Sequence, residues 1–213
     1  VVSAYGRKVA LIHGAKAYAA CQALLTPALG SLDVVREVCY GQEATYENVA
    51  RLTEDPDVRR ADVLIGIGGG STLDCSKAIC AGVPYAGDPW ELVLDRTKVQ
   101  DCLPLITVLT MAATGSEMDN IAVISNPETK DKRGFSSYGM YPRFSILDPV
   151  YTFTVPRSQT AAGTADIMSH IMESYFDQVR GASVQDGLSE ALLKTCRRRS
   201  RWLTLTTTKP ARI

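Results

Sequence analysis

Short apolar runs alternate with amphipathic stretches along the first two thirds of the chain. The runs that are short and continuous enough to be buried strands are 9–12, 34–39, 61–67 and 105–109. Between them, apolar residues recur at helical spacing over 17–25, 45–53 and 71–81. Strands that alternate with helices are typical of βαβ units, so the pattern predicts an α/β fold with a parallel sheet.

The pattern changes after Asp148-Pro149, where only helical spacing continues. A long helical stretch opens at Thr154 or Arg157 and runs to about Phe176. Helical spacing resumes over 184–196, after a short break that contains a glycine. We therefore expect an α/β domain followed by the first helices of an all-helical domain. The ranges expected for these two parts are 1–152 and 153–196.

The last segment, 197–213, fits neither pattern. It holds six of the chain's 23 basic residues and none of its 23 acidic ones, so 1–196 has 17 basic against 23 acidic residues. We interpret this segment as an aberrant basic tail that is either disordered or translated from a shifted reading frame. A basic-tailed binding protein, with Arg197–Arg201 on an anionic partner, is an alternative. The acidic remainder argues against a nucleic-acid surface.

The composition, with 46% hydrophobic and 22% charged residues, is that of an ordinary globular protein. No apolar run approaches the length of a membrane span, and six scattered cysteines form no CxxC pair. We expect reduced thiols, a cytoplasmic location and no membrane partner. The sequence starts at Val1 without a Met, which indicates that it begins inside a longer reading frame. Self-association into a homo-oligomer stays open.

Two polar turns that contain glycine follow predicted strands. The first is Gly68-Gly69-Gly70-Ser71, where glycines let the backbone approach a phosphate at a helix start. We expect Ser71 to be the helix N-cap and Asp74 to lie in the first turn. The second turn is 113–117, and two such turns on neighbouring strands favour a nucleotide site. The spacing is not that of the Rossmann fingerprint, so tight turns without a ligand are the alternative.

A candidate metal site lies in the first long helix that follows the α/β domain. Asp166 and His170 are four residues apart, so both side chains project from one helix face and can share a cation. The alternative is an Asp–His hydrogen bond or a solvated helix face. A metal site needs three or four protein ligands, and the only other histidine is His13. The site is therefore incomplete as the sequence stands.

Several of these segments together resemble the iron-containing alcohol dehydrogenase family, especially its branch of butanol-dehydrogenase-like enzymes and NADP-linked aldehyde reductases. Their order and spacing match from about residue 61 to residue 196, and 1–60 match more loosely. The matching segments are 66–77 (GIGGGSTLDCSK), 109–118 (LTMAATGSEM), 131–133 (DKR), 142–149 (PRFSILDP) and 159–175, which begins QTAAG and includes His170.

The resemblance implies an α/β dinucleotide-binding domain followed by an all-helical domain with a divalent metal, iron or zinc. It implies hydride transfer between NADP or NAD and a small alcohol or aldehyde, whose oxygen the metal polarises. The residues that it implies for the coenzyme are Gly69, Gly70, Ser71 and Asp74 at the pyrophosphate, Thr110, Thr114 and Ser116 along the phosphate and nicotinamide path, and Lys132 on the nicotinamide side. Asp166 and His170 would be the first two metal ligands.

Two departures from the family pattern affect the expected activity. Family members supply two further histidines downstream, and this chain has none there. The similarity also stops at Cys196. We therefore expect a truncated form that is weakly active or inactive, or alternatively a non-catalytic nucleotide-binding module or a relic.

The residues after the first predicted strand bear on the choice of coenzyme. NAD-preferring dehydrogenases commonly place a carboxylate after a strand, where it binds the ribose 2′-hydroxyl and repels a 2′-phosphate. Here the strand is followed by His13-Gly14-Ala15-Lys16, with one cation and no acid. We predict tolerance of, or preference for, NADP, with a solvated Lys16 that contacts no ligand as the alternative.

Overall fold

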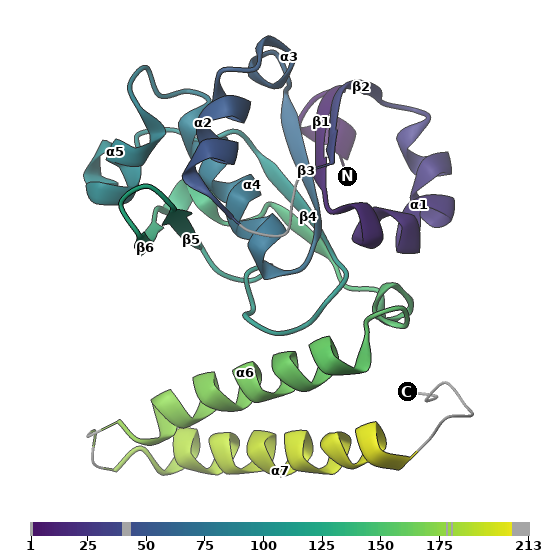
Figure 1. Cartoon of the computed structure of the whole chain (residues 1–213), viewed down its shortest axis with the longest axis vertical. Coiled ribbons are helices and arrows are strands. Elements are labelled where there is room, and N and C mark those ends of the chain that lie inside the picture. The colour runs from purple at the N-terminus through teal and green to yellow at the C-terminus, as the bar shows by residue number, and fades with distance from the viewer. Residues whose placement is uncertain (1, 40–43, 178, 180, 206–213) are drawn as a thin grey trace. The chain divides into compact units, whose positions relative to one another are not determined.

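The structure is a computed structural model that describes residues 2–39, 44–177, 179 and 181–205 (Figure 1). The chain forms two compact units. The first consists of Val1–Thr110 and Gly115–Tyr151, and the second of Met111–Thr114 and Thr152–Ile213. The short segment Met111–Thr114, which follows the strand 105–109, is thus grouped with the helices of the second unit.

The first unit is built on a five-stranded parallel sheet with the strand order β2-β1-β3-β4-β7. The strands are β1 (Lys8–His13), β2 (Asp33–Cys39), β3 (Val63–Gly68), β4 (Leu105–Leu109) and β7 (Phe144–Ile146). The first four coincide with the predicted strands, so the predicted α/β fold with a parallel sheet is confirmed. β3 and β4 are buried along their whole length, as expected for strands covered on both faces.

Helices cover both faces of this sheet. The helices of the first unit are α1 (Ala15–Leu29), α2 (Tyr46–Thr53), α3 (Pro56–Arg59), α4 (Gly70–Gly82) and α5 (Pro89–Leu94), with 3₁₀ turns at Val2–Ala4, Arg96–Lys98, Tyr138–Met140 and Pro149–Thr152. Cys21 and Leu25 of α1 pack with Leu11 and Ile65 on one face. Residues of α2 and α4 pack with Ala10 and Leu64 on the other face.

The connections of the sheet reverse direction between β1 and β3. From β1 the chain passes through α1 to β2 on one side, and from β3 it passes through α4 to β4 on the other side. Because α1 and α4 cover opposite faces, the loops after β1 and β3 lead to opposite faces of the sheet, and open α/β sheets have their ligand crevice at such a point of the carboxyl edge. The fold therefore places the expected ligand position between these two strands.

An antiparallel hairpin that the sequence analysis did not predict joins the first unit. Its strands are β5 (Ile121–Asn126) and β6 (Asp131–Ser136). The hairpin lies beside α4 (Figure 1), and Ala122, Ile124 and Phe135 are buried in the same apolar cluster as residues of α4. The apolar run of β5, 121–124, is as continuous as 9–12, so the sequence carried a signal for this strand, whereas β6 (DKRGFS) has no such run.

The start of α4 differs from the prediction. Gly69, with φ −90° and ψ −173°, is the N-cap, and α4 begins at Gly70. The prediction that Ser71 caps the helix is therefore wrong. Asp74 also lies beyond the first turn, in which no acidic residue occurs. The helix begins earlier because the strand ends at Gly68 and the chain passes through a single connecting residue.

The second unit consists mainly of two helices, α6 (Arg157–Tyr175) and α7 (Ser183–Leu205), which run side by side as an antiparallel pair (Figure 1). α7 continues nine residues past the predicted end at Cys196, so the part of the basic segment up to Leu205 is helical. Arg and Leu favour helix, and this propensity decides the conformation where the periodic apolar pattern is missing. The rest of the predicted tail, 206–213, lies outside the described residues.

The remaining observations concern thiols and surface charge. All six cysteines are free thiols, and Cys21, Cys75, Cys80 and Cys102 are buried. Burial raises the pKa of the Cys75 thiol to about 12.

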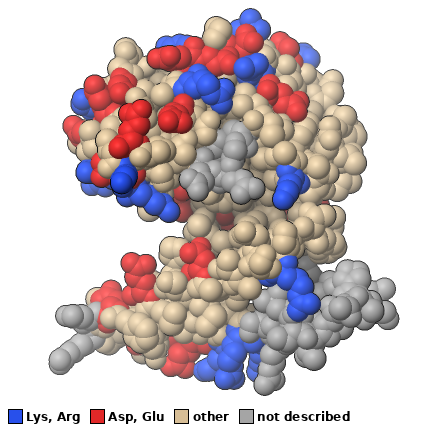
Figure 2. All heavy atoms as spheres, viewed as in Figure 1, with Lys and Arg blue, Asp and Glu red and all other residues tan. Residues whose placement is uncertain are grey.

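Among the described residues, no helix combines the length and apolar character that a membrane span requires. On the face of the first unit shown in Figure 2, basic and acidic side chains are intermingled.

Candidate functional site

The turn between β3 and α4 lies at the carboxyl edge of the sheet. The amides of Thr72 and Leu73 donate to the carbonyl of Gly69 over 3.0 and 3.1 Å and so fix the first turn of α4. The amide end of this 13-residue helix has a positive partial charge, which attracts a phosphate. The Ser71 side chain is exposed on this turn. The turn is therefore suited to an anionic ligand.

The loop after β1 meets this turn at the same point of the edge. A Cβ placed on Gly14 would lie 4.0 Å from Oγ1 of Thr72. The two loops that flank the β1/β3 crevice are thus neighbours, as the reversal of connections requires.

Two glycines of β3 are required by the packing of α4. A Cβ on Gly66 would lie 2.6 Å from Oγ of Ser76, and a Cβ on Gly68 would lie 2.4 Å from Oγ1 of Thr72. Both distances are too short for real atoms, so only glycine lets α4 approach the strand this closely. These glycines therefore set the position of the phosphate turn.

The second predicted turn follows β4. The Thr110 amide donates to the Gly68 carbonyl over 3.0 Å, which ties the end of β4 to the end of β3. Gly115 has φ +77°, a conformation that favours glycine. Thr114 is exposed and lies in the second unit.

Asp74 and Ser116, both expected to contact the coenzyme, contact each other. The Ser116 hydroxyl donates to Oδ1 of Asp74 over 2.6 Å, and the Val123 amide donates to Oδ2 over 3.0 Å. Ser116 is only 2% exposed. Both carboxylate oxygens therefore have protein donors, and this pair anchors the chain after β4 to α4.

Burial raises the pKa of the Asp74 carboxyl, although the hydrogen bonds from Ser116 and Val123 act to lower it. The folded protein therefore keeps this proton over a pH range in which the unfolded chain has lost it. The contribution of Asp74 to stability should fall as the pH rises from the ordinary value of 3.8 through the raised pKa. Asp74→Asn, which does not titrate, should gain stability relative to the wild type over that range. Urea unfolding between pH 3.5 and pH 7 measures this difference.

Asp62 provides a control for which the expected change of stability with pH has the opposite sign. Amide hydrogen bonds from Lys8 and Arg7, both 3.0 Å long, lower the pKa of this carboxyl. Asp62→Asn should therefore lose stability relative to the wild type as the pH rises. If the free energies of unfolding of the wild type and of Asp74→Asn changed in parallel with pH, the expectation for Asp74 would be contradicted.

The structure places an acid at the end of β1 that the sequence analysis missed. Nε2 of His13 lies 3.1 Å from Oε1 of Glu37, which comes from β2. The His13 ring is buried against the ring of Tyr18, with 4.2 Å between centroids. Its Nδ1 has no hydrogen-bond partner among the described residues. Parallel pairing of β1 and β2 brings together two residues that are 24 positions apart.

Lys132, the last residue expected at the coenzyme, is exposed on β6 opposite Ser125 of β5. No contact links it to the phosphate turn within the described part of the chain. The structure thus brings together the glycine turn, Thr110, Asp74 and Ser116, and leaves Lys132 on the surface of the hairpin.

The two candidate metal ligands lie on one face of α6. Nε2 of His170 is 3.8 Å from Oδ2 of Asp166, and Nδ1 is 4.0 Å from Oε2 of Glu173. The His170 side chain is 57% exposed. Imidazole and carboxylate are donors that iron and zinc accept. No group of three or more such donors occurs among the described residues, so these two fit part of a metal shell.

The sequence model of the family described as "Iron-containing alcohol dehydrogenase" matches residues 1–149, about 70% of the chain. This chain belongs to the iron-containing alcohol dehydrogenase family. The predicted family is thus confirmed, and the crevice described above lies in the part that the family model covers.

Individual relatives show the same relationship. NADH-dependent butanol dehydrogenase A of Clostridium acetobutylicum is 62% identical over 135 residues, 63% of this chain and 35% of that protein. NADPH-dependent aldehyde reductase YqhD of Escherichia coli is 36% identical over 171 residues, 79% of this chain and 44% of that protein. The solved structure of NADH-dependent butanol dehydrogenase A from Thermotoga maritima superposes with a TM-score of 0.86 at 33% identity, covering 92% of this chain and 50% of that one. The chain thus spans half or less of the length of these proteins.

Proposed function

We propose that this chain is the nucleotide-binding part of a metal-dependent oxidoreductase that transfers hydride between NAD(P)(H) and a small alcohol or aldehyde. The observation that supports this most directly is the reversal of connections between β1 and β3, where Gly14 lies close to Thr72 in the first turn of α4. Family membership supports the same reaction, since the relatives described above are NADH- or NADPH-dependent enzymes by name.

The roles proposed for the coenzyme residues follow their surroundings. Gly69, Gly70 and Ser71 would bind the pyrophosphate through the first turn of α4. Thr110 and Thr114 would border the path towards the nicotinamide, and Lys132 would approach it from the hairpin. Asp74 and Ser116 would act through the backbone that they hold, because their polar atoms bond to each other.

The metal site would use Asp166 and His170 of α6. When bound, iron or zinc would polarise the oxygen of the alcohol or aldehyde. The i,i+4 spacing presents both side chains on one face of the helix, and their exposure leaves them accessible to an ion and to further ligands. Two donors do not complete a shell, so we propose these residues as part of one.

Isothermal titration of NADH against the 213-residue chain tests nucleotide binding directly. We expect one site per chain with saturable heat. A chain that is folded by circular dichroism and gives no heat with either NADH or NADPH would contradict the proposal. An unfolded chain would instead agree with the relic considered in the sequence analysis.

The choice of coenzyme depends on two opposite charges at the end of β1. Lys16 is exposed in the first turn of α1 and would favour a 2′-phosphate, which supports the expected tolerance of NADP. Glu37, whose side chain is 49% exposed, adds a carboxylate 3.1 Å from His13 and would oppose a 2′-phosphate. We propose that both coenzymes bind and that Glu37 limits the affinity for NADPH.

Glu37→Gln should raise the affinity for NADPH about threefold to tenfold, because it removes repulsion of about 1 kcal/mol between partly solvated charges. The affinity for NADH should stay within about twofold, since NADH has no 2′-phosphate and glutamine can still accept a hydrogen bond from the ribose 2′-hydroxyl. Fluorescence titration with both coenzymes measures the ratio. Glu47→Gln on α2, an exposed residue with the same loss of charge, is the control. An unchanged ratio in Glu37→Gln would remove Glu37 from coenzyme recognition.

A further inference from the structure

Lys77 of α4 is the largest fully buried side chain in the described structure, with 0% exposure. Its Nζ lies 2.7 Å from Oδ1 of Asp119 and 2.9 Å from the carbonyl oxygen of Ile121. Lysine is rarely buried completely, because an ammonium group loses its hydration unless it is paired. The proposed function described above gives this side chain no role.

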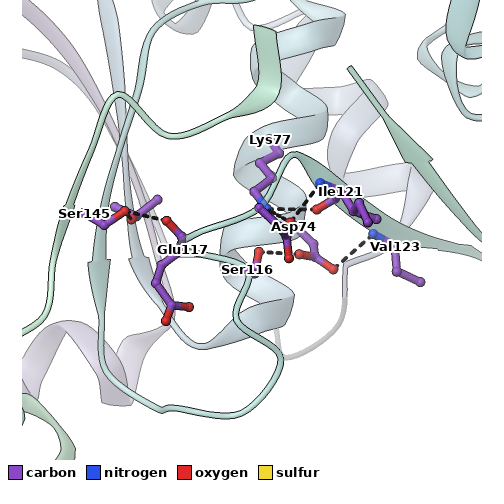
Figure 3. A network of polar contacts seen from close by, with 9 residues as sticks. Asp74, Lys77, Ser116, Glu117, Ile121, Val123 and Ser145 are labelled. Atoms are coloured by element: carbon purple, nitrogen blue, oxygen red, sulfur yellow. Dashed lines mark hydrogen bonds and ion pairs between the residues drawn. The ribbon is translucent and has the colours of Figure 1, made fainter. Parts of the chain in front are cut away.

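Both acceptors of Lys77 belong to the segment 116–123, which comprises the end of the connection after β4 and the first residues of β5. One helical turn earlier on α4, Asp74 accepts hydrogen bonds from the same segment, through Ser116 and Val123 (Figure 3). The two residues have opposite charges and are spaced i,i+3, so they face one side of the helix. Four points of the segment 116–123 are thus attached to α4 by Lys77, which is fully buried, and Asp74, which is half-buried.

The segment is also fixed at its other side. Oγ of Ser145, on β7, donates to the carbonyl of Glu117 over 2.7 Å, and the Thr107 hydroxyl of β4 donates to Ser145 over 2.8 Å (Figure 3). Within the segment, the Ile121 amide donates to Oδ1 of Asp119 over 2.8 Å. The segment is therefore held between α4 and two strands of the sheet.

Only the lysine of this ion pair is fully buried, since the Asp119 side chain is 38% exposed. An apolar side chain could fill the space of Lys77, and buried ion pairs are often replaceable by apolar residues without loss of stability. Such a replacement would not fix the segment in one register, because apolar contacts are not directional. A buried ammonium that is bonded to a defined carboxylate and a defined carbonyl does fix it. This difference separates a positioning role from a packing role.

We propose that Lys77 and Asp74 are positioning residues for the coenzyme. They hold 116–123 against α4, so that the chain from Gly115 onwards stays fixed relative to the first turn of that helix. Neither side chain touches the coenzyme. The proposal rests on the proposed nucleotide site and adds two residues that act on it through the backbone.

The test compares the wild type with Lys77→Met and with the double variant Lys77→Met/Asp119→Leu. The single variant removes the cation, and the double variant replaces the ion pair by two apolar side chains. Lys98→Met is the matched control, because Lys98 pairs with Glu91 over 2.6 Å at a site where both side chains are nearly half exposed. Hydrogen exchange of the peptide 115–123, the thermal midpoint and the dissociation constant for NADH at 15 °C are measured for each protein.

We expect amide exchange in 115–123 to accelerate at least tenfold in both Lys77 variants and to stay unchanged in Lys98→Met. The dissociation constant for NADH should rise at least tenfold in both Lys77 variants. In the double variant the thermal midpoint should return towards that of the wild type, while the affinity stays low. A role in packing alone would instead restore affinity together with stability.

Wild-type affinity in the double variant, or unchanged exchange in 115–123, would overturn the positioning role. Failure of the wild-type chain to bind NADH would overturn the proposed function and, with it, the part of this proposal that concerns the coenzyme. Hydrogen exchange would still decide in that case whether Lys77 fixes the segment, so the two failures are distinguishable.

Discussion

Gly68→Ala is expected to lower the affinity for NADH at least tenfold and the free energy of unfolding by about 1–3 kcal/mol. The added Cβ would lie 2.4 Å from Oγ1 and 2.6 Å from Cβ of Thr72, a buried residue in the first turn of α4. To relieve this overlap, the helix start must move away from β3. The phosphate turn would move with it, so stability and binding should be lost together. Isothermal titration and urea unfolding of the same preparation measure both quantities.

Two further variants separate this overlap from a general effect of alanine. Gly30→Ala is the control, because Gly30 has φ −60° and an added Cβ would come no closer than 3.6 Å to any atom beyond its neighbours. Gly68→Ala/Thr72→Gly removes the opposing side chain and should recover part of the stability, less about 1 kcal/mol for a glycine in a helix. If Gly68→Ala binds NADH within twofold of the wild type, close packing of α4 on β3 does not control the phosphate turn.

The 213-residue chain alone is expected to bind zinc or iron with a dissociation constant weaker than about 10 μM, because two ligands supply only part of the free energy of a complete shell. It should also show no metal-dependent turnover of small alcohols or aldehydes. Asp166 and His170 are both substantially exposed, so water competes for the ion, and among the described residues no third side chain, Glu173 included, completes a group that could hold a metal. Competition with a chromophoric chelator measures the affinity, and coenzyme absorbance at 340 nm follows turnover.

His170→Ala identifies the binding residue. It should weaken the residual zinc binding at least tenfold, whereas His13→Ala, at the other histidine, should leave zinc binding unchanged. Turnover that disappears on chelation and returns with iron or zinc would contradict the expectation. It would mean that further ligands complete the shell of Asp166 and His170.

The central strands were predictable because burial on both faces leaves an apolar run that needs no partner to be recognised. β3 and β4 are of this kind. β5 also contains a continuous apolar run, 121–124, and could have been recognised from it, whereas β6, with the sequence DKRGFS, has none. β7, with three residues, is too short for any periodic signal. β6 and β7 form because they pair with strands that are distant in the sequence or separated from them by a turn, and their own residues do not indicate this pairing.

The candidate site divides in the same way. The glycine turn and the Asp166–His170 pair are local patterns, and a sequence displays them directly. The partners of Asp74 and Lys77 are 42 or more positions away, and Glu37 is 24 positions from His13, so only the fold reveals these contacts. Lys77 lies in one of the segments that resemble the family, but a lysine in a helix is ordinarily solvated, so the sequence did not predict that it is buried.

The reversal of connections between β1 and β3 also has a practical meaning for handling the protein. Every ligand-facing loop proposed above leaves a strand at its carboxyl end, whereas the returns into the strands, such as the one through the exposed Ser31, lie at the opposite edge. Fluorophores, purification handles or surface tethers attached at that far edge would be separated from bound nucleotide by the length of the strands. A sensor for reduced coenzyme could therefore be immobilised through that edge, and the proposed binding site for NADH or NADPH would stay accessible.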